Sequence, residues 1–308
     1  MEQNQQNNEH KSVEHAGHNK NWYDKSYKWI LIIPALMLIF SIAYLVVFNS
    51  KNGDIIYKDV SLTGGTTITV FDGKVDTTAL KESLKSEFPD LLLREISDIR
   101  TGKNKGFSVE TKSEVSSIKA ALEKSLGYDL TTENSSVEFS GASLSSGFYK
   151  QLRFAILLAF GFMAIVVFLL FRTIIPSGAV ILSAFADIVM TLAVVDISGM
   201  KVSTAGIIAF LMLIGYSVDT DILLTTRVLK KREGTVNERI SDAFKTGLTM
   251  TLTAIAAVGA SLIVIYSFSE TLRQIFSIIL IGLGFDIFNT WVTNASILKW
   301  YAEAKDIQ

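Results

Sequence analysis

Long apolar runs alternate with polar stretches along this chain. Six of the runs reach the roughly 17 to 25 helical residues that cross the hydrocarbon core of a membrane. We predict membrane-spanning helices over residues 29–48, 154–171, 174–195, 202–224, 248–268 and 275–300. The first span stands alone, and the other five follow one another as a bundle over residues 154–300. The pattern predicts a polytopic α-helical membrane protein with one soluble insertion.

The insertion, residues 49–153, has the pattern of a folded domain. Strand-like alternation occurs at 66–71, 92–101, 106–111 and 135–140, and helical spacing of apolar residues occurs at 76–88 and 113–126. This order, β-α-β-β-α-β, predicts an α+β ferredoxin-like domain. No cofactor fingerprint occurs in it, so we expect a protein-contacting module whose exposed sheet edge pairs with a partner strand or an emerging chain.

Lysine and arginine gather in the flanks on one side of the predicted bundle. They occur before the first span, at Arg172 between spans two and three, between spans four and five (residues 227–245) and at the end of the chain, whereas the short loops on the opposite side contain only Lys201 and Arg273. The positive-inside rule then places both termini, residues 1–28 and 301–308, in the cytoplasm and the insertion outside the cell membrane. A T-x-x-E capping box at Thr235 and Glu238 predicts a short helix along the membrane in the basic loop.

The amino-acid composition excludes several kinds of functional site. The chain has no cysteine, which excludes disulfides, thiolate catalysis, iron–sulfur clusters and cysteine-type zinc sites. Its three histidines, His10, His15 and His18, lie in a polar N-terminal stretch that we expect to be a disordered tail. The net charge of -1 gives no reason to expect a nucleic-acid partner. We expect no bound metal or cofactor.

Four aspartates interrupt the apolar spans: Asp187, Asp219, Asp221 and Asp286. A carboxylate in hydrocarbon costs at least a few kcal/mol. Interhelical hydrogen bonds to threonine or asparagine return only about 1 kcal/mol each, so a purely structural role hardly offsets that cost. Apart from Lys299 at the very end of span six, no basic residue lies inside a span to neutralise them, and such a carboxylate can take up and release protons. Further polar residues that we expect to support this site are Asn289, Thr251 and Thr253.

The segment "GLGFD", residues 282–286, also suggests an intramembrane aspartyl protease with a second aspartate on span four. Its glycine-to-aspartate spacing is one residue too long, and span four has Y-S-V-D where those enzymes have adjacent Tyr and Asp. The protease remains a remote alternative.

Several segments together resemble one known family. They are "LTGGTTITV" in the insertion, "LIGYSVDTDILLTTRV" in span four, "KTGLTMTLTAIAAV" in span five and "FDIFNTWVTNASILKWY" at the end. From residue 29 onward the chain resembles the SecD/SecF family of protein-export membrane proteins, in the archaeal type of its SecF branch, whose fold is related to resistance-nodulation-division (RND) transporters. The resemblance implies a non-enzymatic partner of SecD that assists the SecY channel in moving unfolded polypeptide, driven by a proton or sodium gradient. The alternative is a self-sufficient RND-type exporter of small molecules or lipids, although those normally have two six-span halves in one chain.

The resemblance also bears on the aspartates. Asp219 matches the acid of SecD, the acid of bacterial SecF falls at Thr220, and neither branch has one at Asp221. Asp187 matches an aspartate in span three of bacterial SecF. The match implies that Asp219 carries the ion. Asp219 is about 12 Å of helix rise from Arg227, so we expect Asp221, nearer the cytoplasmic surface, to be the more accessible to water. Two residues apart, the two side chains point about 200° away from each other.

Overall fold

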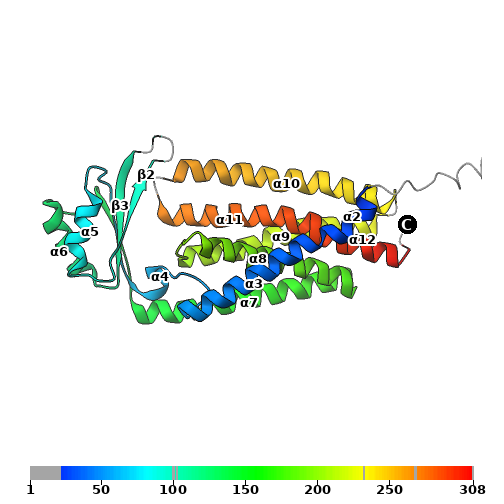
Figure 1. Ribbon diagram of the computed structural model, residues 1–308, viewed down its shortest axis with the longest axis horizontal. Coiled ribbons are helices and arrows are strands. Elements are labelled where there is room, and N and C mark those ends of the chain that lie inside the picture. The colour runs from blue at the N-terminus through cyan, green and yellow to red at the C-terminus, as the bar shows by residue number, and fades with distance from the viewer. Residues whose placement is uncertain (1–21, 99–100, 102, 232, 267–268, 307–308) are drawn as a thin grey trace, which may run out of the picture.

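A helical bundle carries a small α/β domain at one end (Figure 1). The computed structural model describes residues 22–98, 101, 103–231, 233–266 and 269–306, so the three histidines lie outside the described residues. The last described residues lie at the end of the bundle opposite the domain. We call these two ends the domain end and the far end.

Six helical segments of the described chain are long and apolar enough to cross a membrane. Their ranges are Ser26–Asn52, Ser145–Phe171, Ile174–Ile197, Thr204–Lys230, Val236–Ile265 and Thr271–Ala304. The first covers the end of α2 (Trp22–Ile30) and all of α3 (Ile32–Asn52). The next four lie in α7 (Ala142–Phe171), α8 (Ile174–Ile197), α9 (Thr204–Lys230) and α10 (Val236–Ile265). The sixth is divided into α11 (Glu270–Phe288), a π-helical turn η1 (Asn289–Asn294) and α12 (Ala295–Ala304).

Side-chain caps fix where these helices begin. Ser203 accepts from the Gly206 N–H at the start of α9, and Ser269 accepts from the Leu272 N–H at the start of α11. Thr235 and Glu238 form the expected capping box. The short helix predicted beside it is wrong, because the box starts α10, which continues without a break into the fifth span.

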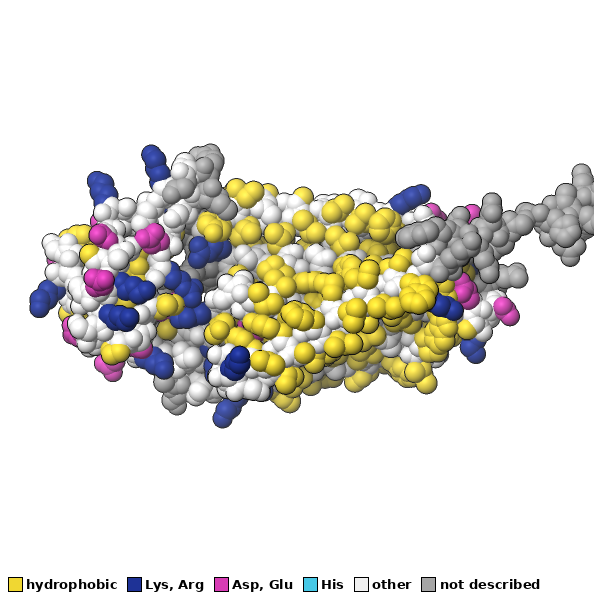
Figure 2. All heavy atoms as spheres, viewed as in Figure 1, with side chains coloured by type: hydrophobic (Ala, Val, Ile, Leu, Met, Phe, Trp, Pro, Cys, Tyr) yellow, Lys and Arg dark blue, Asp and Glu magenta, His cyan; other side chains and the backbone are white. Residues whose placement is uncertain are grey.

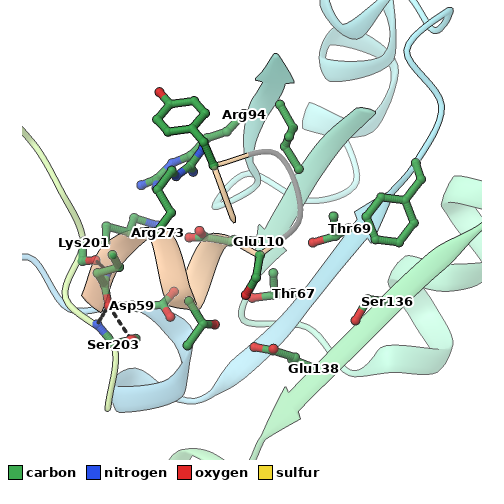
Figure 3. A pocket seen from close by; sticks show the side chains of 16 residues that line it. Asp59, Thr67, Thr69, Arg94, Glu110, Ser136, Glu138, Lys201, Ser203 and Arg273 are labelled. Carbon is green, nitrogen blue, oxygen red and sulfur yellow. Dashed lines mark hydrogen bonds and ion pairs between the residues drawn. The ribbon is translucent and has the colours of Figure 1, made fainter. Parts of the chain in front are cut away.

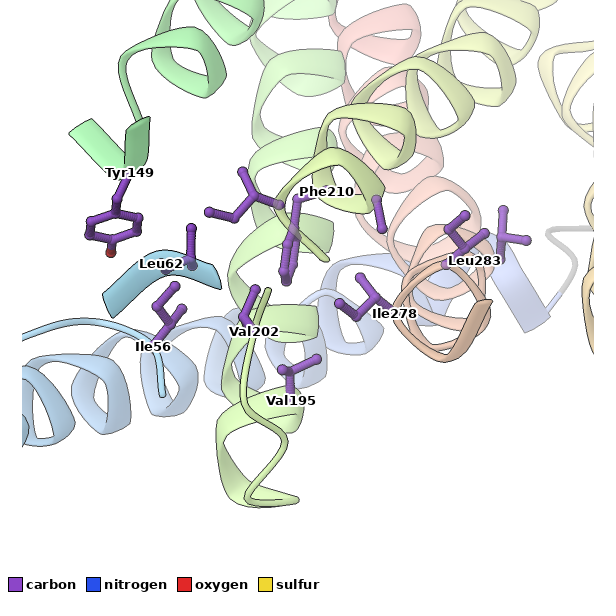
Figure 4. Close-up of a cluster of buried hydrophobic side chains, with 11 residues drawn as sticks. Ile56, Leu62, Tyr149, Val195, Val202, Phe210, Ile278 and Leu283 are labelled. Carbon is purple, nitrogen blue, oxygen red and sulfur yellow. The ribbon is translucent and has the colours of Figure 1, made fainter. Parts of the chain in front are cut away.

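The helices differ in burial. α8 and α9 are mostly buried, whereas α3, α7 and α10 are mostly exposed. Their exposed apolar side chains cover the middle of the bundle, and charged side chains gather at its two ends (Figure 2). At the domain end, apolar side chains such as Val195, Phe210 and Ile278 pack between α8, α9 and α11 (Figure 4). Gly282 of α11 packs against Leu213 of α9, at a site where a Cβ would collide with that leucine.

The small domain has the predicted order of elements: β1 (Gly65–Val70), α5 (Thr77–Lys85), β2 (Leu92–Ser97), β3 (Asn104–Thr111), α6 (Val115–Leu126) and β4 (Ser135–Ser140). The sheet is antiparallel in the order β2-β3-β1-β4. α5 and α6 cover one face, where Leu84, Phe107, Ile118 and Leu122 form a core. A short helix, α4 (Val60–Thr63), precedes the domain.

The other face of the sheet borders a polar cleft above the ends of α9 and α11 (Figure 3). Within this cleft Lys201 forms an ion pair with Glu110 of β3, and the Gln274 side chain donates to the Lys201 carbonyl. Gln274 also accepts from the Ser203 N–H at 3.0 Å. The loop between α8 and α9 therefore joins the sheet to α11.

Candidate functional site

Three of the four predicted aspartates come together in the middle of the bundle. Asp187 of α8, Asp221 of α9 and Asp286 of α11 are each at most 1% exposed. Each comes from a different span, and none forms an ion pair with a lysine or arginine within the described part of the chain. Their hydrogen-bond partners are neutral side chains. We call this group, with those partners, the aspartate cluster.

Asp187 is held by two neighbouring spans. The Ser217 hydroxyl of α9 donates to its Oδ2 at 2.5 Å, and the Asn289 amide of η1 donates to its Oδ1 at 2.7 Å. Both partners are fully or almost fully buried. Because the two donors come from different helices, this carboxylate links α8 to α9 and to the sixth span.

Asp286 is bound by hydroxyl groups on three elements. Thr220 lies 2.9 Å from its Oδ1 and Thr290 lies 3.3 Å from the same atom, while Thr251 of α10 lies 3.5 Å from Oδ2. The predicted supporting residue Thr251 is thus part of the cluster.

The Thr220 hydroxyl can satisfy Asp286 in either protonation state. It also lies 3.0 Å from the Ser217 carbonyl, which can only accept a hydrogen bond. When Asp286 is ionised, Thr220 donates to the carboxylate. When Asp286 carries a proton, it donates to Thr220, which then donates to the carbonyl. Gain or loss of a proton therefore reorients one hydroxyl without leaving a buried group unpaired.

Asp221 has fewer hydrogen bonds than the other two aspartates of the cluster. Its Oδ1 accepts from the Asn294 amide at 2.8 Å, while its Oδ2 has no hydrogen-bond partner among the described residues. Nearby buried oxygens of Asn294 and Thr225 also lack one within the described chain. These atoms offer several oxygen acceptors for a proton, a water molecule or a small cation at one place.

The π-helical turn η1 orients both Asn289 and Asn294 toward aspartates of the cluster. In an α-helix, residues five apart differ by about 140° around the axis, so Asn289 and Asn294 would face different neighbours. A π-helix bonds i to i+5, which brings residues five apart toward the same side. Asn289 consequently reaches Asp187 while Asn294 reaches Asp221. Turns of this kind occur often at functional sites.

Sequence reasoning missed several buried polar residues that share one spacing. Ser183, Asp187 and Thr191 follow one another at four-residue intervals on α8, and Ser217, Asp221 and Thr225 do the same on α9. All six side chains are buried. Residues at i, i+4 and i+8 share a helix face. This repeated S-x-x-x-D-x-x-x-T pattern in the sequence could have indicated which face of each span points into the bundle.

Two of the predicted residues lie outside the cluster. Asp219 is exposed on α9, and Thr253 is exposed on α10, where it donates to the Thr249 carbonyl. The expectation that Asp221 would be the more accessible aspartate is wrong, because Asp221 is fully buried. The angle of about 200° correctly separated the two side chains, but only the packing of α8 and the sixth span against α9 decides which one faces inward.

The cluster gathers three buried carboxyl groups from three different spans. Several buried negative charges without a cation are very costly in a medium of low dielectric constant. The described residues contain no group of His, Cys, Asp and Glu arranged to hold a metal ion. Asp219, the aspartate of the Y-S-V-D segment, is exposed whereas Asp286 is buried, so Asp219 lies outside the group that contains Asp286.

Known proteins place the chain in a family. The family model described as "Protein export membrane protein SecD/SecF, C-terminal" matches residues 119–304. Over 283 residues the chain is 42% identical to the protein-export membrane protein SecF of Methanocaldococcus jannaschii, a match that covers 90% of this chain and 96% of that protein. The chain belongs to the SecD/SecF family. A second SecF, from Methanothermobacter thermautotrophicus, is 39% identical, with 91% of this chain and 94% of that protein covered.

A solved SecD/SecF structure has the same fold. The chain matches SecDF, a translocon-associated membrane protein from Thermus thermophilus, with a TM-score of 0.72 at 18% identity. The match covers 90% of this chain but only 38% of the SecDF chain. This member of the SecD/SecF family therefore spans well under half of that longer SecDF protein.

Proposed function

We propose that this chain is the SecF-type half of a complex with SecD, and that it assists the export of unfolded polypeptides through the SecY channel with energy from a proton or sodium gradient. The observation that carries the proposal is the aspartate cluster: three buried carboxylates from three spans, with no cation paired to them in the described chain. Family membership supports the export role.

The far end of the bundle is the cytoplasmic side in this proposal. Arg227 and Lys230 in the last turn of α9, and Lys231 directly after it, lie there, as the positive-inside rule requires. The β-α-β-β-α-β domain, whose strand order fits a ferredoxin-like fold, then lies outside the cell membrane.

Ion coupling in this account is a change in helix packing. A proton or sodium ion that binds at the cluster alters the bonds from Asp187 to Ser217 and Asn289, and from Asp286 to Thr220. These bonds cross between α8, α9 and the sixth span. The loop from α8 to α9 contacts β3 and α11 through Lys201 and Gln274. Rearrangement at the cluster is thereby transmitted to the domain end.

We assign Asp219 to the contact with SecD. Ile208, Met212, Tyr216 and Asp219 form an exposed stripe along α9. Asp219 has no hydrogen-bond or ion-pair partner among the described residues, and an uncovered carboxylate facing lipid costs roughly 2.5–3.5 kcal/mol. A polar or basic side chain on a SecD span that packs against this stripe removes that cost.

Two variants separate these roles. Asp221→Asn keeps the size of the side chain and removes its charge, so the complex with SecD forms normally while export stimulated by an ion gradient falls. Asp219→Asn weakens co-purification with SecD. Measurements of gradient-dependent precursor transport into membrane vesicles, together with SecD recovery in mild detergent, give both results. Undiminished transport in Asp221→Asn would refute ion coupling at this residue.

A further inference from the structure

The two edges of the sheet are protected differently. At one edge, β2 carries the charged residues Arg94 and Glu95, and its register with β3 shifts between Ile96 and Ser97. Charges and bulges are common devices that prevent unwanted strand pairing. At the other edge, β4 pairs with β1 in continuous register over all its residues and contains a single charge, Glu138. Its outer edge has no strand beside it within the described chain.

Large apolar side chains are exposed on this open edge. Val137 is 41% exposed and Phe139 is 56% exposed. Val137 is paired in register with Ile68, and paired residues share a face of the sheet. Ile68 is completely buried in the core beneath α5 and α6. The apolar face of the sheet therefore continues past its helical cover onto β4.

A groove of about 420 Å³ lies beside the same strand. Phe139 of β4 and Phe148 of α7 supply its large apolar side chains, and Phe148 is 42% exposed. Ser61 of α4 and Thr204 of α9 add polar atoms. The groove thus lies where the domain meets the bundle, with an open strand along one wall.

We propose that β4 and this groove bind an extended segment of the polypeptide that is being exported, which adds to the sheet as a strand beside β4. Main-chain groups of the bound segment pair with the open edge, and an apolar side chain of the segment packs between Phe139 and Phe148. This assignment rests on the proposed export function. Strand addition reads the backbone more than the side chains, which suits a site that meets many different sequences.

The size of the site favours a passing chain over a permanent subunit contact. A stable protein interface contributes roughly 20–30 residues from each side. Eight residues line this groove, and β4 is six residues long. A contact of this size is weak and short-lived, as the forward movement of a substrate requires.

Photo-crosslinking tests the site in the complete protein. The chain has no cysteine, so Ser136→Cys on β4 and Ser125→Cys on α6 each create a single attachment point at an exposed serine. Each variant, in its complex with SecD in lipid nanodiscs, receives a benzophenone label. It is then illuminated with a permanently unfolded, carboxymethylated secretory protein as the probe. We expect adducts with the probe at position 136 and few at position 125.

A second substitution distinguishes strand addition from nonspecific binding of the unfolded probe. Val137→Lys places a charge on the open edge, and we expect about fivefold weaker binding of the probe at position 136. Ser125→Lys leaves that binding unchanged. Equal adducts at both positions, no effect of Val137→Lys, or adducts of position 136 with SecD in place of the probe would each overturn the proposal. Crosslinking requires no ion gradient, so it fails or succeeds independently of the Asp221→Asn transport result.

Discussion

The ion pair between Lys201 and Glu110 joins the α8–α9 loop to the sheet, and its removal is a direct perturbation of the contact between the bundle and the domain. The Glu110 side chain is 5% exposed and that of Lys201 is 27% exposed. Lys201→Met leaves a nearly buried carboxylate without its cation. Glu110→Gln removes the charge on the other side and leaves Lys201 partly solvated.

Loss of one partner of a fully buried pair costs about 3–5 kcal/mol. The cost here is smaller, because Lys201 is partly exposed and because Arg94 and Arg273 line the same cleft. We expect Lys201→Met to lower the free energy of opening this contact by about 2 kcal/mol. The double variant leaves no unpaired charge and should be destabilised by less than the sum of the two single variants.

Amide hydrogen exchange in nanodiscs measures this opening. The Val202 N–H donates to the Tyr57 carbonyl at 2.6 Å, and the Ser203 N–H donates to Gln274 at 3.0 Å, so both report on the loop. About 2 kcal/mol corresponds to roughly 30-fold faster exchange at these amides. Unchanged exchange in Lys201→Met, or strictly additive effects in the double variant, would refute a coupled contact.

Two further predictions concern stability. Gly282→Ala puts a methyl group against Leu213 and should cost about 1–3 kcal/mol by overpacking α9 against α11, whereas Gly259→Ala meets no neighbouring atom and should not lower the melting temperature. Burial tends to raise the pKa of Asp54, but hydrogen bonds from Tyr149 and the Ile55 N–H, with the Lys58 charge, hold that pKa below its ordinary value. The contribution of Asp54 to stability is therefore present above its unfolded pKa of about 3.9 and is lost as the pH falls through its folded pKa. Melting temperatures of Asp54→Asn, measured against pH, should lack this loss. Identical pH dependence in Asp54→Asn and the unsubstituted protein would contradict the assignment.

Much of the fold follows from local patterns in the sequence. Span-length apolar runs and alternating strands are properties of short segments, and the order of elements in the small domain follows from them. The sequence also predicts the capping box at Thr235, but it does not predict the length of the helix that follows. Nothing within the box indicates that the polar first turns of α10 continue into a span.

The site shows where such reasoning stops. Sequence identifies costly aspartates, and helix geometry separates Asp219 from Asp221. Which of them faces inward depends on which neighbouring helices pack against α9, and that is a property of the assembled bundle. The π-helical turn is even harder to predict from sequence, because the α-helical period places Asn289 and Asn294 on different faces of the helix. Their joint approach to Asp187 and Asp221 appears only when the hydrogen bonds are known.

The central claim is that the aspartate cluster, not Asp219, exchanges an ion during export. Infrared difference spectroscopy of the protein in lipid nanodiscs, recorded while the pH or the sodium concentration is stepped, detects carboxyl groups that gain or lose a proton. We expect a carboxyl band that is lost or altered in Asp221→Asn and in Asp286→Asn and is kept in Asp219→Asn. A band that survives in both cluster variants and disappears only in Asp219→Asn would contradict the account.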